Sequence, residues 1–185
     1  MKKLHLGCGG KHLDGYINID LYEQAGVDLV MDATDLLFVN NSVDEIRSEH
    51  LIEHFTYHQA TKAFKEWFRV LKPGGLLFIE CPDILGYCKR FIGEPENRWC
   101  GIPPGTEFTP RYGHALIQGF FGNQMGPNKP IQYGFGSLPQ LAQTHKSGWT
   151  VGYLTGWLRN VGSTKIESQS KDDMILRVLA WKGQK

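Results

Sequence analysis

The sequence predicts an α/β fold, in which a doubly wound, mostly parallel sheet of about seven strands carries helices. Three observations predict it. Short apolar segments that end in glycine or aspartate recur near the start of the chain, as strands of such a sheet do. Residues 58–71 and 148–161 have apolar side chains at intervals of three and four, which is typical of amphipathic helices. A Gly- and Pro-rich stretch separates those two helices.

The individual strands follow from local composition. The first is a short apolar run that enters a glycine turn, and the second alternates apolar and polar residues before Asp20. Residues 76–81 are almost wholly apolar, as in a central strand buried on both faces, and Pro82 ends them. Pro73-Gly74-Gly75 stops the preceding helix. We expect strands at residues 4–6, 16–20, 27–31, 43–48, 76–81, 165–168 and 173–181.

Residues 83–145 form an insertion before the penultimate helix of a single domain, 1–185. No helical or strand period persists there, and a structureless loop of that length is improbable unless it is a lid or a binding segment. We expect a mobile lid that supplies an acceptor pocket; the alternative is that its aromatic side chains form a small core of their own. Those side chains are Tyr87, Phe91, Trp99, Phe108, Tyr112, Phe120, Phe121, Tyr133 and Phe135.

Composition narrows the function classes. The 20 basic and 19 acidic residues give a net charge of +1, which provides no broad positive field for a nucleic acid. The four cysteines lack a C-x-x-C pair. Only Leu4 and Leu6 stand between the basic start and Cys8, too few for a signal peptide, and no apolar run approaches a membrane span. These features predict a cytoplasmic protein that acts on small molecules.

A strand, a glycine turn and a second strand that ends in aspartate are the layout of a nucleotide-cofactor site. Glycines let a cofactor approach the backbone closely, and a carboxylate at the end of the second strand can accept hydrogen bonds from both ribose hydroxyls. A glycine turn alone is a weak signal, but here it begins an ordered series of motifs. The series is Leu4-His5-Leu6-Gly7-Cys8-Gly9-Gly10, Tyr16-Ile17-Asn18-Ile19-Asp20, Asp32-Ala33-Thr34-Asp35-Leu36, Glu49-His50-Leu51-Ile52-Glu53-His54-Phe55 and Val70-Leu71-Lys72-Pro73-Gly74-Gly75.

In order and spacing this series resembles the type 11 class I S-adenosylmethionine (SAM) dependent methyltransferases, which have a Rossmann-like fold. The resemblance covers roughly residues 1–82 and resumes at 145–162. It implies SAM as the cofactor. By that resemblance the glycine turn holds the methionine part of SAM, Asp20 the ribose hydroxyls and Leu21 one face of the adenine. It also implies that Asp32 accepts from the adenine amino group and that the Ala33 backbone contacts a ring nitrogen. Glu49 and His50, after the fourth strand, would close over the sulfonium end. The implied cofactor residues are Gly7, Cys8, Gly9, Asp20, Leu21, Asp32, Ala33, Glu49 and His50.

Plainer interpretations stay open for several of these residues. Asp20 and Asp32 could simply cap turns, and Leu21 could belong to the core. A Rossmann dehydrogenase is the nearest competing fold, but Leu13 stands where its third glycine is expected. The interval before the second strand is also short, so the first helix is predicted to be short or missing. The insertion or a second subunit would then cover the cofactor, which makes a homodimer one expected partner.

His50-Leu51-Ile52-Glu53-His54 also spells H-x-x-E-H, the inverted zinc-protease pattern, which on a helix would put His50, Glu53 and His54 on one face. The methyltransferase series already accounts for these positions, and no fourth ligand is apparent in the sequence. We therefore predict that no metal is bound. A metal-dependent hydrolase that uses His50, Glu53 and His54 remains the remote alternative function.

The expected reaction is methyl transfer from SAM to an O or N acceptor on a small molecule. Such a displacement gains most from positioning and, for a hydroxyl acceptor, from a base. No residue is marked as that base; the candidates are His54, His114 and His145. A non-catalytic SAM-binding sensor or partner subunit would show the same cofactor residues and is the main alternative.

Overall fold

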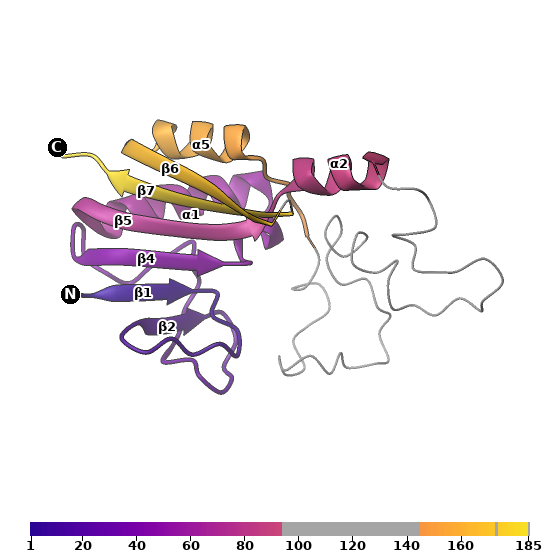
Figure 1. The fold of residues 1–185 in the computed structure, drawn as a ribbon. Helices are drawn as coiled ribbons and strands as arrows, with labels where there is room; N and C mark the ends of the chain where they lie inside the picture. Colours follow the sequence, from indigo (N-terminus) through magenta and orange to yellow (C-terminus); the bar gives the residue numbers. More distant parts are fainter. Residues whose placement is uncertain (94–144, 173, 185) are drawn as a thin grey trace.

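The structure, a computed structural model, describes residues 1–93, 145–172 and 174–184. Its centre is one seven-stranded sheet with the strand order β3-β2-β1-β4-β5-β7-β6 (Figure 1). The first five strands pair in parallel, and β7 runs antiparallel to both β5 and β6. The predicted sheet is confirmed. The strands are β1 Lys3–Leu6, β2 Ile17–Asp20, β3 Leu29–Val30, β4 Val43–Glu49, β5 Leu71–Pro82, β6 Ser163–Asp172 and β7 Ile175–Lys182.

Four helices accompany the sheet in the described ranges. They are the 3-10 helix η1 Ile52–His54 and the α-helices α1 Tyr57–Val70, α2 Ile84–Gly93 and α5 Val151–Asn160. Helix α1 begins with a capping box, in which Thr56 Oγ1 accepts from Gln59 N (3.3 Å) and Gln59 Oε1 accepts from Thr56 N (2.9 Å). The two long helices match the predicted segments 58–71 and 148–161. Within the described residues, no helix is both long and apolar enough to cross a bilayer.

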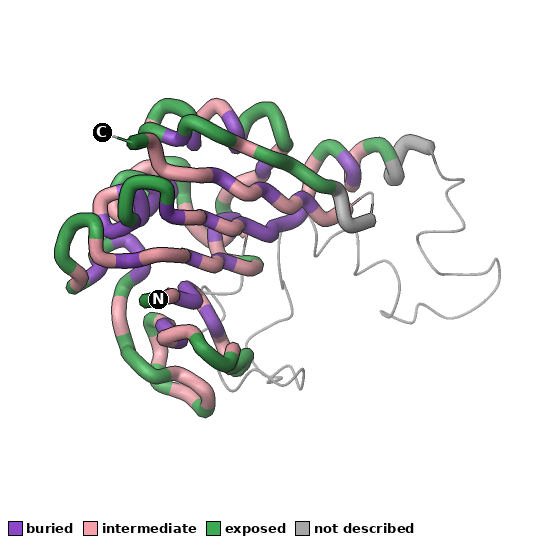
Figure 2. Tube along the Cα trace, turned by 60° about the vertical axis from the view of Figure 1, so that its left-hand side comes forward, coloured by how far each residue is buried: buried purple, intermediate pink, exposed green. Residues whose placement is uncertain are grey.

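Helices α1 and α5 lie side by side and cover one face of the sheet. The rings of Phe64 in α1 and Trp157 in α5 have centroids 6.5 Å apart, and both pack against the fully buried Trp149. Burial alternates along the strands, because successive side chains point to opposite faces (Figure 2). The core under the helices includes Leu4, Leu6, Ile46, Leu77, Ile79, Leu176 and Val178.

The opposite face of the sheet carries charged pairs between neighbouring strands. Lys3 pairs with Glu45 at 2.7 Å, and Arg177 with Glu80 at 2.5 Å. These partners lie directly opposite in the strand registers, so each pair ties two strands together. This face explains why β4 alternates apolar and polar residues instead of reading as a wholly apolar central strand.

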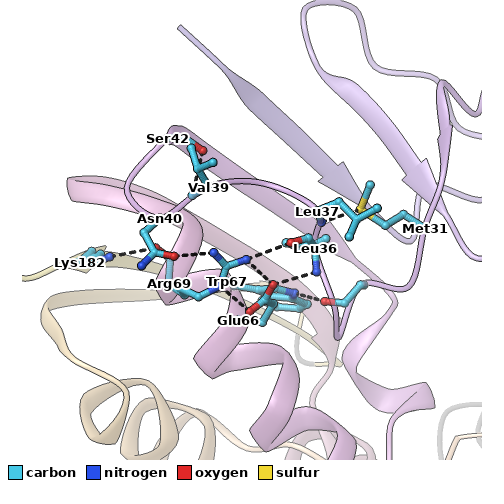
Figure 3. Close-up of polar contacts among 11 residues, drawn as sticks. Met31, Leu36, Leu37, Val39, Asn40, Ser42, Glu66, Trp67, Arg69 and Lys182 are labelled. Atoms are coloured by element: carbon cyan, nitrogen blue, oxygen red, sulfur yellow. Dashed lines mark hydrogen bonds and ion pairs between the residues drawn. The ribbon is translucent and has the colours of Figure 1, made fainter.

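The chain between β3 and β4 is fastened to α1 by Arg69 (Figure 3). Its guanidinium donates to both carboxylate oxygens of Glu66, to Leu36 O (2.9 Å) and to Asn40 Oδ1 (2.6 Å). Glu66 Oε1 also accepts from Leu36 N at 2.8 Å. The hydrogen bond from Arg69 holds the pKa of Glu66 below its ordinary value. This network fixes the segment that begins with the predicted adenine-binding residues.

Strand β5 begins five residues earlier than the sequence predicted. Leu71 already pairs with Val43, whereas the next paired residue of β4, Glu45, lies opposite Leu76. The residues between form an irregularity in the ladder, and Gly74 takes a positive φ of 76° there. The Pro-Gly-Gly sequence therefore ends the helix as predicted but lies inside the strand, not before it.

Helix α2 falls within the predicted insertion, 83–145, and is a helix that periodicity did not reveal. Residues 94–144 lie outside the described residues, and with them most of the predicted lid, most of its aromatic side chains and His114. At the far end of the insertion, Trp149 forms an isolated bridge with Asp83. The insertion therefore leaves the sheet and returns to it at neighbouring points.

Candidate functional site

The glycine turn after β1 is bound to the end of β2. Gly7 and Gly9 have φ values of +65° and +53°, a region that glycine enters without steric cost. A Cβ on Gly7 would lie 2.7 Å from Leu51 Cδ1, so glycine also lets Leu51 pack against the turn. Cys8 N donates to Ile19 O (3.1 Å) and Gly9 N donates to Asp20 Oδ2 (2.8 Å). The glycine turn and Asp20, both predicted from the sequence as cofactor residues, are thus joined by a hydrogen bond.

Asp20 organises two backbone segments. Besides Gly9 N, it accepts from Tyr22 N through Oδ1 at 3.1 Å. The capping role considered for Asp20 is therefore present in the structure. It does not exhaust the carboxylate, which has about four acceptor sites and remains partly exposed. Leu21 beside it is 54% exposed, so it is not a core residue.

Cys8 lies inside the turn with only 3% of its surface exposed. Burial, reinforced by the charge of Asp20, raises the pKa of its thiol to about 12. The thiol is therefore neutral at physiological pH. Its place in the turn is that of a small apolar side chain rather than a nucleophile.

The segment after β3 presents the second pair of predicted adenine contacts. Asp32 is exposed, and its Oδ1 accepts from Thr34 N at 2.7 Å, which again is a turn cap. Ala33 is buried, and its carbonyl accepts from Trp67 Nε1 at 2.7 Å. Because Trp67 belongs to the core face of α1, this bond holds the segment after β3 against that helix.

Glu49, at the end of β4, is held by two cations. Lys11 from the loop after β1 binds Oε2, and Arg47 from β4 itself binds Oε1. Burial acts to raise the pKa of Glu49, but the hydrogen bonds from Lys11 and Arg47 outweigh it and hold that pKa below its ordinary value. The sequence did not single out these partners, although Arg47 and Glu49 share one face of a strand.

His50 has a positive φ of 51°, which is uncommon for a residue with a side chain. Its N–H donates to Glu80 O (2.8 Å), and its ring lies 3.2 Å from Glu53 Oε1 and 3.6 Å from Glu80 Oε1. The hydrogen bond with Glu53 raises the pKa of His50 against the opposing effect of burial. The ring therefore faces two carboxylates, Glu53 in η1 and Glu80 in β5.

The H-x-x-E-H string does not lie on one α-helix. His50 precedes η1, which contains only Ile52–His54. The groups that come together are instead Glu53, His54 and His145, whose ligand atoms all lie within 4.8 Å of one another. Two of the three histidines suggested as a base, His54 and His145, thus lie together, and no local pattern indicated that His145 would join Glu53 and His54.

Comparison with known proteins gives a consistent family. Residues 4–79 match the model of the methyltransferase domain family. No curated protein matches the sequence significantly. Among solved structures, the PH0226 protein of Pyrococcus horikoshii has 17% identity and a TM-score of 0.62, with 98% of this chain and 81% of that chain covered. A SAM-dependent methyltransferase of Methanosarcina mazei has 16% identity and a TM-score of 0.59, with 100% and 93% covered.

A third similar structure contains ligands. The 1,6-didemethyltoxoflavin-N1-methyltransferase of Burkholderia thailandensis, crystallised with 1,6-didemethyltoxoflavin and S-adenosylhomocysteine, has 14% identity and a TM-score of 0.59, with 98% and 71% covered. At these identities the structures establish the fold. The family match spans β1 to β4 and most of β5, and SAM is the cofactor that this family implies. The resemblance predicted from the sequence is confirmed: residues 4–79 match the methyltransferase domain family, and the whole described chain has the fold of solved SAM-dependent methyltransferases.

Proposed function

We propose that the chain is a methyltransferase that binds SAM at the carboxyl ends of β1 to β4 and transfers its methyl group to an O or N acceptor on a small molecule. One observation carries the proposal: the Gly7–Gly9 turn is bound through Gly9 N to Asp20 Oδ2 (2.8 Å). The bond joins a glycine turn, whose backbone a ligand can approach closely, to a carboxylate that keeps free acceptor sites. A ribose and the chain attached to it require both features.

The residues present fit the cofactor. Asp20 would accept from the ribose hydroxyls, and Leu21, which is exposed beside it, would cover one face of the adenine. Asp32, also exposed, would accept from the adenine amino group, and Gly7 and Gly9 would leave room for the methionine part. The chemistry that the bound cofactor supplies is an activated methyl group on a sulfonium.

The small size of the acceptor is supported by two observations of different kinds. A net charge of +1 gives no general attraction for nucleic acids, and the similar toxoflavin enzyme acts on a small ring compound. A cytoplasmic location and a homodimer that covers the cofactor are further parts of this proposal. They rest on the sequence features alone.

The first test is cofactor binding by calorimetry, with S-adenosylhomocysteine as the probe. We expect binding by the wild type and at least a tenfold weaker affinity for Asp20→Ala, since each charge-assisted hydrogen bond contributes about 1.5–3 kcal/mol. Asp20→Asn, which keeps one acceptor oxygen, is expected to lie between them. Asp14→Asn, on the exposed loop before β2, is the matched control and should bind like the wild type.

The second test is turnover. Protein is incubated with SAM labelled at the methyl group and a panel of small amines, phenols and alcohols, and labelled products are separated from SAM. Transfer to one class of acceptor is the expected result. Tight cofactor binding with no transfer to any of them would favour the non-catalytic SAM-binding protein. Absence of binding to S-adenosylhomocysteine would refute the proposal itself.

A further inference from the structure

Glu53, His54 and His145 form a cluster that the cofactor site does not use. Each offers one ligand atom, and these three atoms lie within 4.8 Å of one another. The rings of His54 and His145 meet edge to face with centroids 5.0 Å apart. Two imidazoles and one carboxylate are a recurrent set of protein ligands for Zn²⁺ and neighbouring divalent transition ions.

The cluster is held in place by hydrogen bonds from the segment that follows His145 to the backbone of η1. Lys146 N and Ser147 N donate to Glu53 O at 2.7 and 3.2 Å. Ser147 Oγ and Trp149 Nε1 both donate to Ile52 O, at 3.1 and 3.3 Å. Four hydrogen bonds thus join the segment that carries His145 to η1. The proximity of the three ligands follows from this docking and does not depend on flexible side chains alone.

The buried carboxylate of Glu53 is the evidence that this cluster binds a ligand. Its surface is only 2% exposed, and its Oε1 is 3.2 Å from His50 Nδ1. Its Oε2 is buried and has no hydrogen-bond partner in the described part of the chain. A buried carboxylate oxygen without a partner is costly, and a cation at that oxygen would compensate for it.

The separations of the three ligand atoms are compatible with a shared ion. A point within about 2.8 Å of all three ligand atoms exists in any triangle with sides no longer than 4.8 Å, whereas zinc takes nitrogen and oxygen ligands at about 2.0–2.2 Å. Each donor has to approach by less than 1 Å, roughly what a small side-chain rotation provides. Mg²⁺ and Ca²⁺ prefer all-oxygen sites, so the two imidazoles favour a transition ion.

We propose that Glu53, His54 and His145 bind one divalent transition-metal ion of the zinc type, with Glu53 oriented by His50. This reverses the expectation drawn from the sequence, which lacked a further ligand until His145 was found beside Glu53 and His54. A three-ligand site keeps a coordination position open. The cluster follows the end of β4, so an oxygen or nitrogen of the acceptor could occupy that position, a second step that rests on the proposed function.

The test is a titration of the full chain, freed of metal with a chelator, with CoCl₂ as a spectroscopic substitute for zinc. We expect one equivalent to bind with visible d–d absorption, and ZnCl₂ to displace it. Glu53→Gln and His145→Asn should each weaken Co²⁺ binding by about a hundredfold or more. His58→Asn, on the exposed side of α1, is the matched control and should bind Co²⁺ like the wild type.

The outcomes separate this proposal from the proposed function, because S-adenosylhomocysteine is titrated into the same metal-free protein. No Co²⁺ binding by the wild type, or unchanged binding in a folded His145→Asn variant, refutes the metal site whatever the cofactor does. Co²⁺ binding lost in both variants supports the site even if S-adenosylhomocysteine does not bind. Co²⁺ binding without S-adenosylhomocysteine binding would also favour the metal-dependent hydrolase over the methyltransferase.

Discussion

Replacing Asn18 is expected to destabilise the edge of the sheet that carries the glycine turn. Asn18 is fully buried in β2, and its side-chain oxygen accepts from Leu13 N at 2.9 Å. The same oxygen lies 3.1 Å from Nδ1 of His5, which is 1% exposed. Burial, its largest influence, lowers the pKa of His5 despite that hydrogen bond, so the imidazole is neutral and donates from Nδ1. The amide nitrogen faces the carbonyls of Leu13 and Tyr16.

The magnitude follows from what Asn18→Ala leaves behind. The loop loses a hydrogen bond worth about 1 kcal/mol, and the buried His5 loses its partner at a cost of about 1–3 kcal/mol. We therefore expect the free energy of unfolding to fall by about 2–4 kcal/mol. For a chain of this length that corresponds to a Tm lower by roughly 4–16 °C. Calorimetry or circular dichroism of the thermal transition measures it.

The isosteric variant Asn18→Asp separates hydrogen bonding from shape. It keeps the acceptor oxygen but replaces the donor that faces the carbonyls of Leu13 and Tyr16 with a carboxylate oxygen, and Asp28 already lies 2.9 Å from that nitrogen. We expect clear destabilisation at neutral pH, with Asn160→Ala, at the exposed end of α5, within about 0.5 kcal/mol of the wild type. An Asn18→Asp protein as stable as the wild type would refute the reasoning.

Three further predictions concern single groups. Gly7→Ala should lower stability by about 1 kcal/mol or more and weaken S-adenosylhomocysteine binding in calorimetry, because alanine is strained at a positive φ; an unaffected variant would contradict this. Iodoacetamide at neutral pH should alkylate the partly exposed Cys88 and spare Cys8, as measured by peptide mass spectrometry, and equal rates would be inconsistent with the raised pKa of Cys8. Arg69 lowers the pKa of Glu66 in the folded state, so the stabilisation from this pair is present above the unfolded pKa of about 4.3 and is lost as the pH falls through the folded pKa. Glu66→Gln should therefore make the urea midpoint depend less on pH in the acid range. An unchanged pH dependence would contradict this.

Most of the sheet was predictable because its strands have recognisable local sequence patterns. Gly7 follows β1, Asp20 ends β2 and Asp32 stands two residues after β3, and the apolar stripe of α1 has a clear helical period. The start of β5 was missed because Pro73 and Gly74 are ordinary signals for a turn. The pairing of Leu71 with Val43 depends on a neighbouring strand, which local composition does not contain.

The candidate site was predictable in part for the same reason. Gly9 and Asp20 lie at consecutive strand ends, and such ends meet at one edge of a parallel sheet. The approach of His145 to Glu53 was not predictable. It depends on hydrogen bonds such as that between Ser147 and Ile52, which are 95 residues apart and follow no period in the sequence.

The absence of a helix between β1 and β2, where every residue is described, changes how the two carboxylates of the cofactor edge are used. A loop in place of a helix lets Lys11 cross to Glu49, so that both oxygens of Glu49 are engaged by cations. Asp20 accepts only two backbone N–H groups and keeps acceptor sites for a ligand. Asp20 and Glu49 are two of the three acids that the family resemblance assigned to the cofactor, and of these two Asp20 is ready to bind it as the chain stands. The side chain of Glu49 is only 9% exposed and its charge is already balanced by Lys11 and Arg47, which makes Asp20 the more informative residue to replace.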